Sequence, residues 1–195
     1  MKNKVQWLCA FAVLGLLLGA TGIAIGNIDK LISKTPGGGI AAAAHAAVPV
    51  VVIDPGHGGE DGGCSAADGT TEKELNLEMS RCITDILNAA GYRTVMTRET
   101  DTLLYDMYGD LTDYKGHKKT YDLRNRLRFT QEAGAEYLVS IHMNKFADSR
   151  YKGAQVFYAS APDESRILGE CLQDKLITLL DSSNNRVAKP AEKGI

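Results

Sequence analysis

The run VPVVVI at residues 48–53 constrains the fold more than any other part of the chain. Its β-branched residues follow one another without polar alternation, which is typical of a strand buried on both faces, as in a parallel sheet. Strand-like and helix-like segments then alternate, so we expect an α/β fold, a mostly parallel twisted sheet flanked by helices. The expected helices are 72–90, 122–133 and 163–180, and the further expected strands are 92–97, 137–141 and 153–159.

Composition and charge narrow the class of protein. The chain has 195 residues, of which 44% are hydrophobic and 24% charged, and this suits one globular domain of ordinary size. The net charge is −2, and because the N-terminal part carries a basic excess, the remainder is mildly acidic. We therefore expect no nucleic-acid binding, since phosphate contacts need a basic surface.

The N-terminus has the pattern of a membrane-targeting segment. Lys2 and Lys4 precede an apolar run over residues 5–28, close to the roughly 20 residues that span a bilayer. We expect residues 1–33 to be an uncleaved signal anchor, a transmembrane helix that places the rest of the chain outside the cytoplasm. A cleaved signal peptide that releases the protein is the alternative, because residues 41–47 offer A-x-A-like sites.

The rest of the sequence divides into a linker and a domain. Residues 34–47 are rich in Gly and Ala and are expected to be a linker. Residues 48–195 are expected to form the domain that carries the chemistry. Its final segment from Ser182 resembles a loop that leads to another strand, so we expect the domain to be incomplete at Ile195, with its last strand and helix missing.

Two histidines directly follow expected strands. His57 lies in a Gly-rich turn after residues 48–53, and His142 follows residues 137–141. If these strands are parallel, both histidines lie at the same edge of the sheet, where open α/β folds bind ligands. The turn matches neither the GxxxxGK[ST] nor the GxGxxG phosphate-binding pattern.

A third ligand is expected from the start of the next helix, at the same edge. Thr71 and Glu74 fit a capping box, which leaves Glu72 free to point toward the strand ends. Two His and one Glu suit Zn²⁺ with an open position for water, and they could also hold non-haem iron(II). We favour zinc because nothing in the sequence suggests oxygen chemistry. The opposite interpretation is that these residues form no metal site, so that the two histidines only pack against other side chains and the glutamate is exposed.

Three segments in order carry a resemblance to a known family. IDPGHGGEDGG, TEKELNL and EYLVSIHMN resemble the signatures of the zinc-dependent N-acetylmuramoyl-L-alanine amidases (amidase 3 family), which are bacterial cell-wall hydrolases. The resemblance implies that His57, Glu72 and His142 bind zinc. It also implies a general-base Glu in a VExGFLSN-like segment, which the sequence does not contain. We therefore expect the base beyond Ile195, and the chain as given to hydrolyse substrate slowly or not at all.

The N-terminal anchor, the single domain and the YDLRNR segment at residues 121–126 are further similar to the germination-specific amidases of spore formers. The resemblance implies hydrolysis of the amide between N-acetylmuramic acid and L-alanine in peptidoglycan. It further implies a role in spore cortex maturation, through muramic-δ-lactam formation, and in germination. Peptidoglycan is the expected partner, and the sequence identifies no activating protein. Two other functions stay open, a non-catalytic metal-containing module that binds the cell wall or a partner, and a zinc deacylase of small N-acyl substrates.

Several polar residues near the expected site have two interpretations. Asp54 and Asp61 could accept hydrogen bonds from the histidine rings, or they could cap the Gly-rich turn. Arg124 and Arg126 could contact substrate carboxylates, but a solvated helix face is the commoner role, so they stay outside the expected site. The tyrosines of the polar segment 98–120 could form a wall for glycan, or they could pack the loop down.

Overall fold

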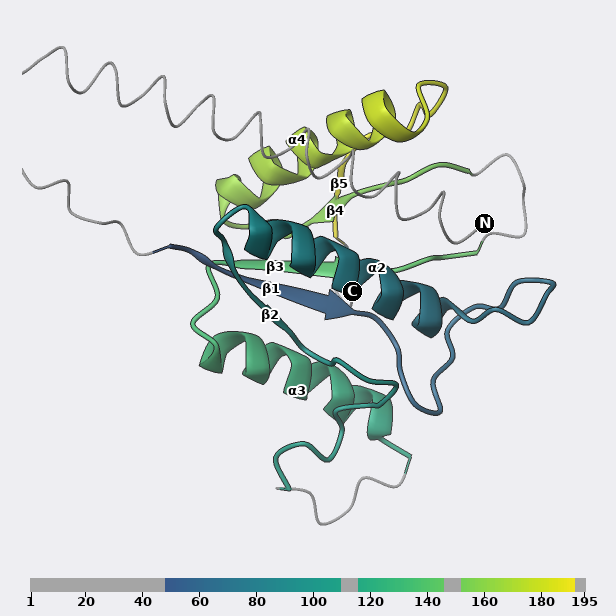
Figure 1. Ribbon diagram of the computed structural model, residues 1–195, viewed down its shortest axis with the longest axis vertical. Coiled ribbons are helices and arrows are strands. Elements are labelled where there is room, and N and C mark those ends of the chain that lie inside the picture. Colours follow the sequence, from purple (N-terminus) through teal and green to yellow (C-terminus); the bar gives the residue numbers. More distant parts are fainter. Residues whose placement is uncertain (1–47, 110–115, 146–151, 192–195) are drawn as a thin grey trace, which may run out of the picture. The chain divides into compact units, whose positions relative to one another are not determined.

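The computed structural model describes residues 48–109, 116–145 and 152–191 (Figure 1). The expected anchor or signal peptide at 1–33 and the linker at 34–47 lie outside these residues. Within the described part of the chain, no helix is long and apolar enough to span a bilayer.

Contacts divide the described chain into two compact units. The first ends at Lys145, and the second begins at Lys152. The elements of the first unit are β1 (Val50–Pro55), α2 (Glu72–Ala89), β2 (Arg93–Met96), α3 (Lys118–Glu132) and β3 (Tyr137–Ile141).

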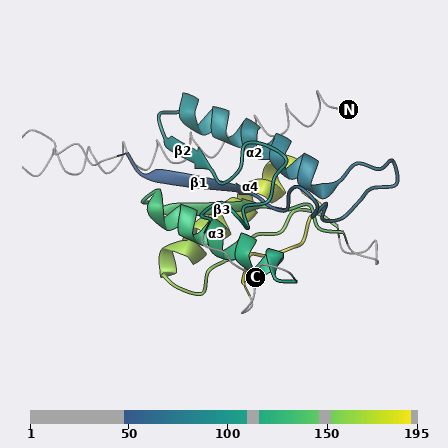
Figure 2. The ribbon, with the colours of Figure 1, turned by 90° about the horizontal axis from the view of Figure 1, so that it is seen from below.

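The sheet of the first unit is parallel. Strand β1 lies between β2 and β3 and pairs in parallel with both. Helices α2 and α3 cover opposite faces of this sheet, as the two perpendicular views in Figures 1 and 2 show. The expectation of a parallel sheet flanked by helices is therefore confirmed for this unit.

The central strand is buried, as its composition predicts. All six residues of β1 are buried, and Val52 and Ile53 have no exposed surface. Val51, Ile53 and Met96 form the buried cluster on the α2 side. The partly buried side chains that pack against it are Leu77, Ile83, Leu87, Tyr92, Val139 and Ile141.

The buried stripe of α2 differs from its apolar periodicity. The spacing of its apolar residues predicts Leu75 on the inner face, but Leu75 is 38% exposed, whereas Glu72, Asn76 and Ser80 are buried. These three follow one another at intervals of four residues, so they share one side of the helix. The Asn76 side chain donates a hydrogen bond to the carbonyl of Gly56 (3.2 Å), so a polar contact helps to set the rotation of the helix.

Several element boundaries also differ from the sequence prediction. Strand β2 is shorter than the expected 92–97, and α3 begins at Lys118 rather than at Asp122. In the first turn of α3, the Tyr121 N–H donates to the carbonyl of His117 (3.1 Å). The end of the polar segment that the sequence predicts as a loop is therefore already helical.

The second unit contains β4 (Phe157–Tyr158), α4 (Asp163–Leu180) and β5 (Lys189–Pro190). Helix α4 has the expected bounds, and β4 pairs with β5 in parallel. The strand expected at 153–159 is only two residues long, because a side chain of α4 takes the place of a partner strand. Gln173 accepts from the N–H of Val156 (2.8 Å) and donates to the carbonyl of Ala154 (3.1 Å).

Candidate metal centre

The structure brings the three expected ligands together at one edge of the sheet. β1 and β3 pair with Pro55 opposite Ile141, so the residues that follow both strands lie at the same edge. One ligand atom from each of His57, Glu72 and His142 lies within 4.8 Å of the other two. Glu72 Oε1 is 3.3 Å from His57 Nε2 and 3.1 Å from His142 Nδ1. The three side chains could therefore hold one metal ion.

Close packing of the turn after β1 explains two of its glycines. A Cβ atom on Gly56 would lie 2.3 Å from the His142 ring, and one on Gly63 would lie 2.7 Å from Glu72 Oε2. Between them, His57 adopts φ +63°, a left-handed conformation that is uncommon for a residue with a side chain. The turn is thus shaped around the three side chains, at a cost in backbone strain that the surrounding contacts must offset.

Glu72 is a buried carboxylate at the centre of this cluster. It is 3% exposed, and it accepts hydrogen bonds from the N–H groups of Cys64 and Met143 at 2.9 Å each. Burial alone would raise its pKa, but these two bonds, together with His142 and His57, lower the pKa of Glu72 to about 2. Glu72 is therefore ionised at neutral pH and presents Oε1 to both rings.

Asp61 orients the ring of His57, one of the two roles considered for it. Its Oδ2 lies 2.9 Å from Nδ1 of His57. Because Asp61 accepts the Nδ1 proton, Nε2 keeps its lone pair on the side of Glu72.

Asp54 contacts neither histidine, so the structure does not support the first of its two interpretations, that of a ring partner. Its carboxylate instead accepts from Thr97 (2.6 Å), Ser140 (2.8 Å) and Arg126 (2.6 Å). Burial raises the pKa of Asp54, but the charge of Arg126 and these hydrogen bonds outweigh burial and hold the pKa below its ordinary value.

Arg126 is a buried structural residue, and its expected place on a solvated helix face is wrong. It is 6% exposed and pairs with both Asp54 (2.6 Å) and Asp122 (2.7 Å). Its guanidinium also donates to the carbonyls of Pro55 (2.9 Å) and His57 (2.8 Å). Arg126 therefore holds the backbone of the turn that carries His57.

Arg98 is a second buried arginine at the turn, and the sequence prediction missed it. It is 3% exposed and donates to the carbonyls of Pro55 (2.9 Å) and Gly56 (3.0 Å). The one available signal was its position just after β2, which ends at the same edge of a parallel sheet.

The other polar residues have structural roles. Glu74 accepts a hydrogen bond from the Thr71 N–H (3.0 Å), which confirms the capping interaction. Glu74 therefore caps the helix, whereas Glu72 faces the two histidines. Arg124 is exposed and lies over the Tyr121 ring.

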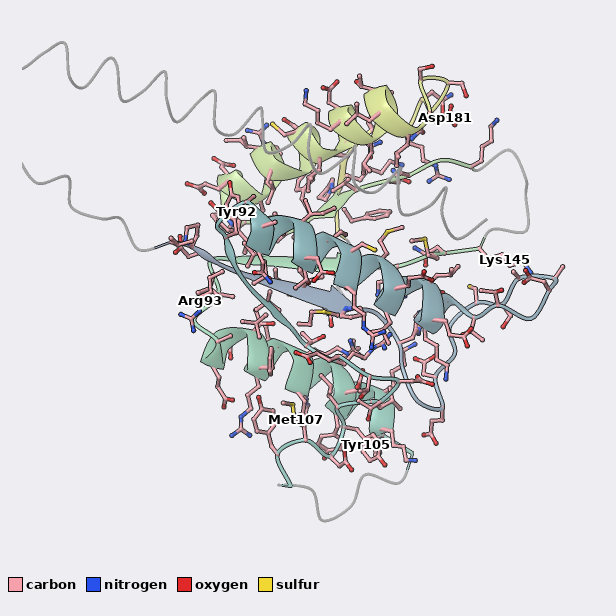
Figure 3. The ribbon with its side chains drawn as sticks, viewed as in Figure 1. Tyr92, Arg93, Tyr105, Met107, Lys145 and Asp181 are labelled. Atoms are coloured by element: carbon pink, nitrogen blue, oxygen red, sulfur yellow. The ribbon has the colours of Figure 1, made fainter. Side chains whose placement is uncertain are left out.

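Tyrosines of the segment before α3 pack against that helix. Figure 3 shows Tyr105 and Met107 on the stretch of chain alongside α3. Lys118 lies over the Tyr105 ring, and the Tyr108 hydroxyl donates to Glu132 (2.8 Å). These contacts support the interpretation that the tyrosines pack the loop down.

Comparison with known proteins places the chain in a family. The family model described as N-acetylmuramoyl-L-alanine amidase matches residues 51–193. The chain belongs to this amidase family. The family that the three sequence segments indicate is therefore confirmed.

Individual amidases agree with this assignment. The germination-specific N-acetylmuramoyl-L-alanine amidase of Bacillus subtilis is 32% identical over 140 residues, which are 72% of this chain and 57% of that protein. The amidase LytC of the same organism is 30% identical over 143 residues, 72% of this chain and 25% of that protein. The chain thus spans little more than half of the first relative and a quarter of the second.

A solved amidase has the same fold. The CwlD amidase of Clostridioides difficile, determined in complex with the GerS lipoprotein, superposes with a TM-score of 0.66 at 34% identity. The match covers 74% of this chain and 73% of CwlD. The α/β architecture and the parallel sheet are therefore those of an N-acetylmuramoyl-L-alanine amidase.

The lowered pKa of Asp54 predicts how stability depends on pH. A carboxylate whose pKa is lower in the folded state stabilises the fold above its unfolded pKa of about 3.9, and this contribution is lost as the pH falls through the folded value. We expect Asp54→Asn to lower the free energy of unfolding by about 3 kcal/mol at neutral pH, because it leaves Arg126 buried with one carboxylate fewer. The difference from wild type should narrow as the pH falls below about 5.

Urea denaturation between about pH 7 and pH 3 measures both effects. Asp85→Asn, at an exposed position of α2, is the control and should change the unfolding free energy by less than about 0.5 kcal/mol. A difference between wild type and Asp54→Asn that does not change with pH would contradict the assignment.

Proposed function

We propose that this chain is a zinc-dependent hydrolase of the amide bond between N-acetylmuramic acid and L-alanine in peptidoglycan. The observation that carries the proposal is the convergence of His57, Glu72 and His142 at the carboxyl edge of an amidase-family sheet. The amidases to which it is similar bear this activity in their names.

The donor set supports zinc as the metal. Ligand bonds of about 2.0–2.2 Å in tetrahedral geometry place neighbouring donor atoms roughly 3.3 Å apart. Glu72 Oε1 lies 3.3 Å and 3.1 Å from the histidine nitrogens that face it. Two imidazoles and one carboxylate are common zinc ligands, and three protein ligands leave a position for water.

The chain's own residues prepare this site. Zinc, when bound, would polarise the lactyl carbonyl and lower the pKa of a bound water. Glu72 is too weak a base, with a pKa of about 2, to keep a proton at neutral pH, so its part is to bind the metal rather than to accept the proton of the water. Asp61 directs Nε2 of His57 toward the metal position. Arg98 and Arg126 keep the turn in place.

The proposed biological setting is the spore cortex, in its maturation and in germination. One relative is a germination-specific amidase, and CwlD was determined with a lipoprotein partner. By this analogy we propose that the chain acts with a lipoprotein at the outer face of the cytoplasmic membrane. The basic residues Lys2 and Lys4 before the apolar run at 5–28 support a tether to that membrane.

Two neighbouring glutamates test the metal site. Glu72→Gln should lose most zinc affinity, because an amide is a poor zinc ligand, whereas Glu74→Gln should keep it and lose about 1 kcal/mol of helix capping. Asp61→Asn should weaken zinc binding by about 10- to 100-fold, since it acts through the ring of His57. Competition with a chromophoric zinc chelator measures the affinity, and unfolding curves without metal control for folding. Unchanged zinc affinity in Glu72→Gln would exclude this site.

The proposed activity is tested with the whole protein as its gene encodes it. Zinc-loaded protein should release alanine amino groups from purified peptidoglycan, and His142→Ala should abolish the release. Binding of sacculi without release would instead favour the non-catalytic wall-binding module. Hydrolysis of small N-acyl compounds but not of sacculi would favour the zinc deacylase.

The proposed tether predicts where the protein is found in the cell. It should sediment with membranes and resist extraction by high salt, because an apolar segment in a bilayer does not depend on charge. Cell fractionation followed by N-terminal sequencing measures this. A soluble secreted form that begins near Val48 would show that the segment is a cleaved signal peptide.

A further inference from the structure

The loop that follows β2 packs closely against the Gly-rich turn that carries His57. A Cβ atom on Gly58 would lie 2.1 Å from the carbonyl oxygen of Thr102, and one on Gly59 would lie 3.3 Å from the backbone nitrogen of Leu103. A contact of 2.1 Å is far shorter than any that a real Cβ atom makes, so only glycine fits at position 58. The backbones of the loop and the turn are therefore in direct contact.

The tip of the turn is a short hairpin closed by Gly58 and Asp61. The Gly58 N–H donates to the carbonyl of Asp61 (2.9 Å), and the Asp61 N–H donates to the carbonyl of Gly58 (3.0 Å). Asp61 also accepts from Nδ1 of His57 (2.9 Å). The position of this hairpin therefore sets the position of the carboxylate that orients the ring of His57.

Two oppositely charged side chains hold the hairpin at Gly59. The Gly59 N–H donates to Asp101 Oδ1 (2.7 Å), and the Gly59 carbonyl accepts from the ammonium group of Lys73 (2.6 Å). The same ammonium group pairs with Asp101 Oδ2 (2.7 Å). Lys73 lies in the first turn of α2 and Asp101 in the loop after β2, so the Lys73–Asp101 pair joins these two segments to the hairpin.

The ammonium group of Lys73 is engaged within the protein. The Lys73 side chain is 16% exposed, and its ammonium group already donates to two acceptors. The backbone of Lys73 is held as well, because Arg98 donates to its carbonyl (3.0 Å) and its N–H donates to the carbonyl of Gly62 (3.2 Å). Although Lys73 directly follows Glu72, these contacts favour a role in holding the turn over a role in contacting substrate.

We infer that the Lys73–Asp101 pair positions the candidate metal centre through Asp61. The pair holds Gly59, and the hairpin that contains Gly59 places Asp61 against Nδ1 of His57. The lone pair of His57 Nε2 then stays directed toward the metal position. Neither member of the pair belongs to the ligand cluster, so both are positioning residues. This inference rests on the proposed zinc centre and identifies residues that prepare it.

The zinc affinity of the whole protein, as its gene encodes it, tests the inference without turnover. Lys73→Met and Asp101→Asn each remove one charge of the pair. Each should weaken zinc binding by about three- to tenfold, a smaller loss than a change at Asp61 itself, because the pair acts through Asp61. Lys73→Arg should restore most of the affinity, since a guanidinium can donate to both acceptors. The control is Glu99→Gln, which removes the same charge as Asp101→Asn at an exposed position of the same loop and should bind zinc as wild type does.

A double-mutant cycle shows whether the pair acts through Asp61. In Asp61→Ala the hairpin has no carboxylate left to position. Adding Lys73→Met to this variant should therefore weaken zinc binding by less than about twofold more. If the two losses were instead additive, Lys73 would act on the metal centre by another route, and the inference would be overturned.

Hydrogen exchange of the metal-free protein separates local positioning from general stability. Loss of the pair should speed the exchange of amides within residues 56–63, because the hairpin loses the contacts that hold Gly59, while the amides of β1 should exchange as in wild type. Mass spectrometry of peptic peptides measures both, and slow exchange in β1 shows that each variant is folded. Equal acceleration in β1 and in residues 56–63 would contradict a local role.

The outcomes separate this inference from the proposed function. Unchanged zinc affinity in both Lys73→Met and Asp101→Asn would refute the role of the pair and leave the proposed zinc amidase intact. Wild type that binds no zinc would refute the zinc proposal and, with it, the effect of the pair on the metal. Faster exchange confined to residues 56–63 would, in that case, still support the hold of the pair on the hairpin.

Discussion

Two buried arginines provide the constraint on which the candidate metal centre depends. The chain leaves β1 through a turn in which His57 has a left-handed backbone, and the turn buries carbonyl groups that no strand can pair. Arg98 and Arg126 donate to the carbonyls of Pro55, Gly56 and His57. An unsatisfied buried carbonyl costs about as much free energy as a lost hydrogen bond. Without the arginines, each of these three carbonyls would lower the stability of the fold by about that amount.

The burial of Arg126 is in turn possible because two carboxylates compensate it. Asp54, at the end of β1, and Asp122, one turn earlier on α3, each accept from its guanidinium. A single buried ion pair seldom stabilises a fold, but removing one partner from such a network is costly. The network thus links the central strand, α3 and the turn, and it gives the turn one conformation.

Two glutamates at the start of α2 have different roles because their side chains point in different directions. Glu72 and Glu74 are two residues apart and have the same chemistry. The first points into the sheet edge, where backbone N–H groups of Cys64 and Met143 compensate its burial, and the second points back to cap its own helix. Glu72 therefore joins the loop before α2 to the loop after β3, which is why a metal position can form between elements distant in sequence.

The sequence alone determined the features that depend on local pattern. An apolar β-branched run predicts a strand buried on both faces, and the capping box predicts which glutamate is free. Parallel strands end at one edge, so the placement of His57 and His142 together also follows from pattern. The bounds of α4 are as predicted because they rest on short-range periodicity, and the parallel sheet is as predicted because strands and helices alternate along the chain.

Only the tertiary structure decided the roles of residues whose partners lie far along the chain. Arg126 meets Asp54 across 72 positions and the carbonyl of His57 across 69, and no local pattern marks either contact. The face of α2 was misjudged for a similar reason, since apolar periodicity gives no weight to Asn76, whose burial depends on the carbonyl of Gly56. Burial of a polar group is favourable only where a partner is present, and the fold alone brings that partner into place.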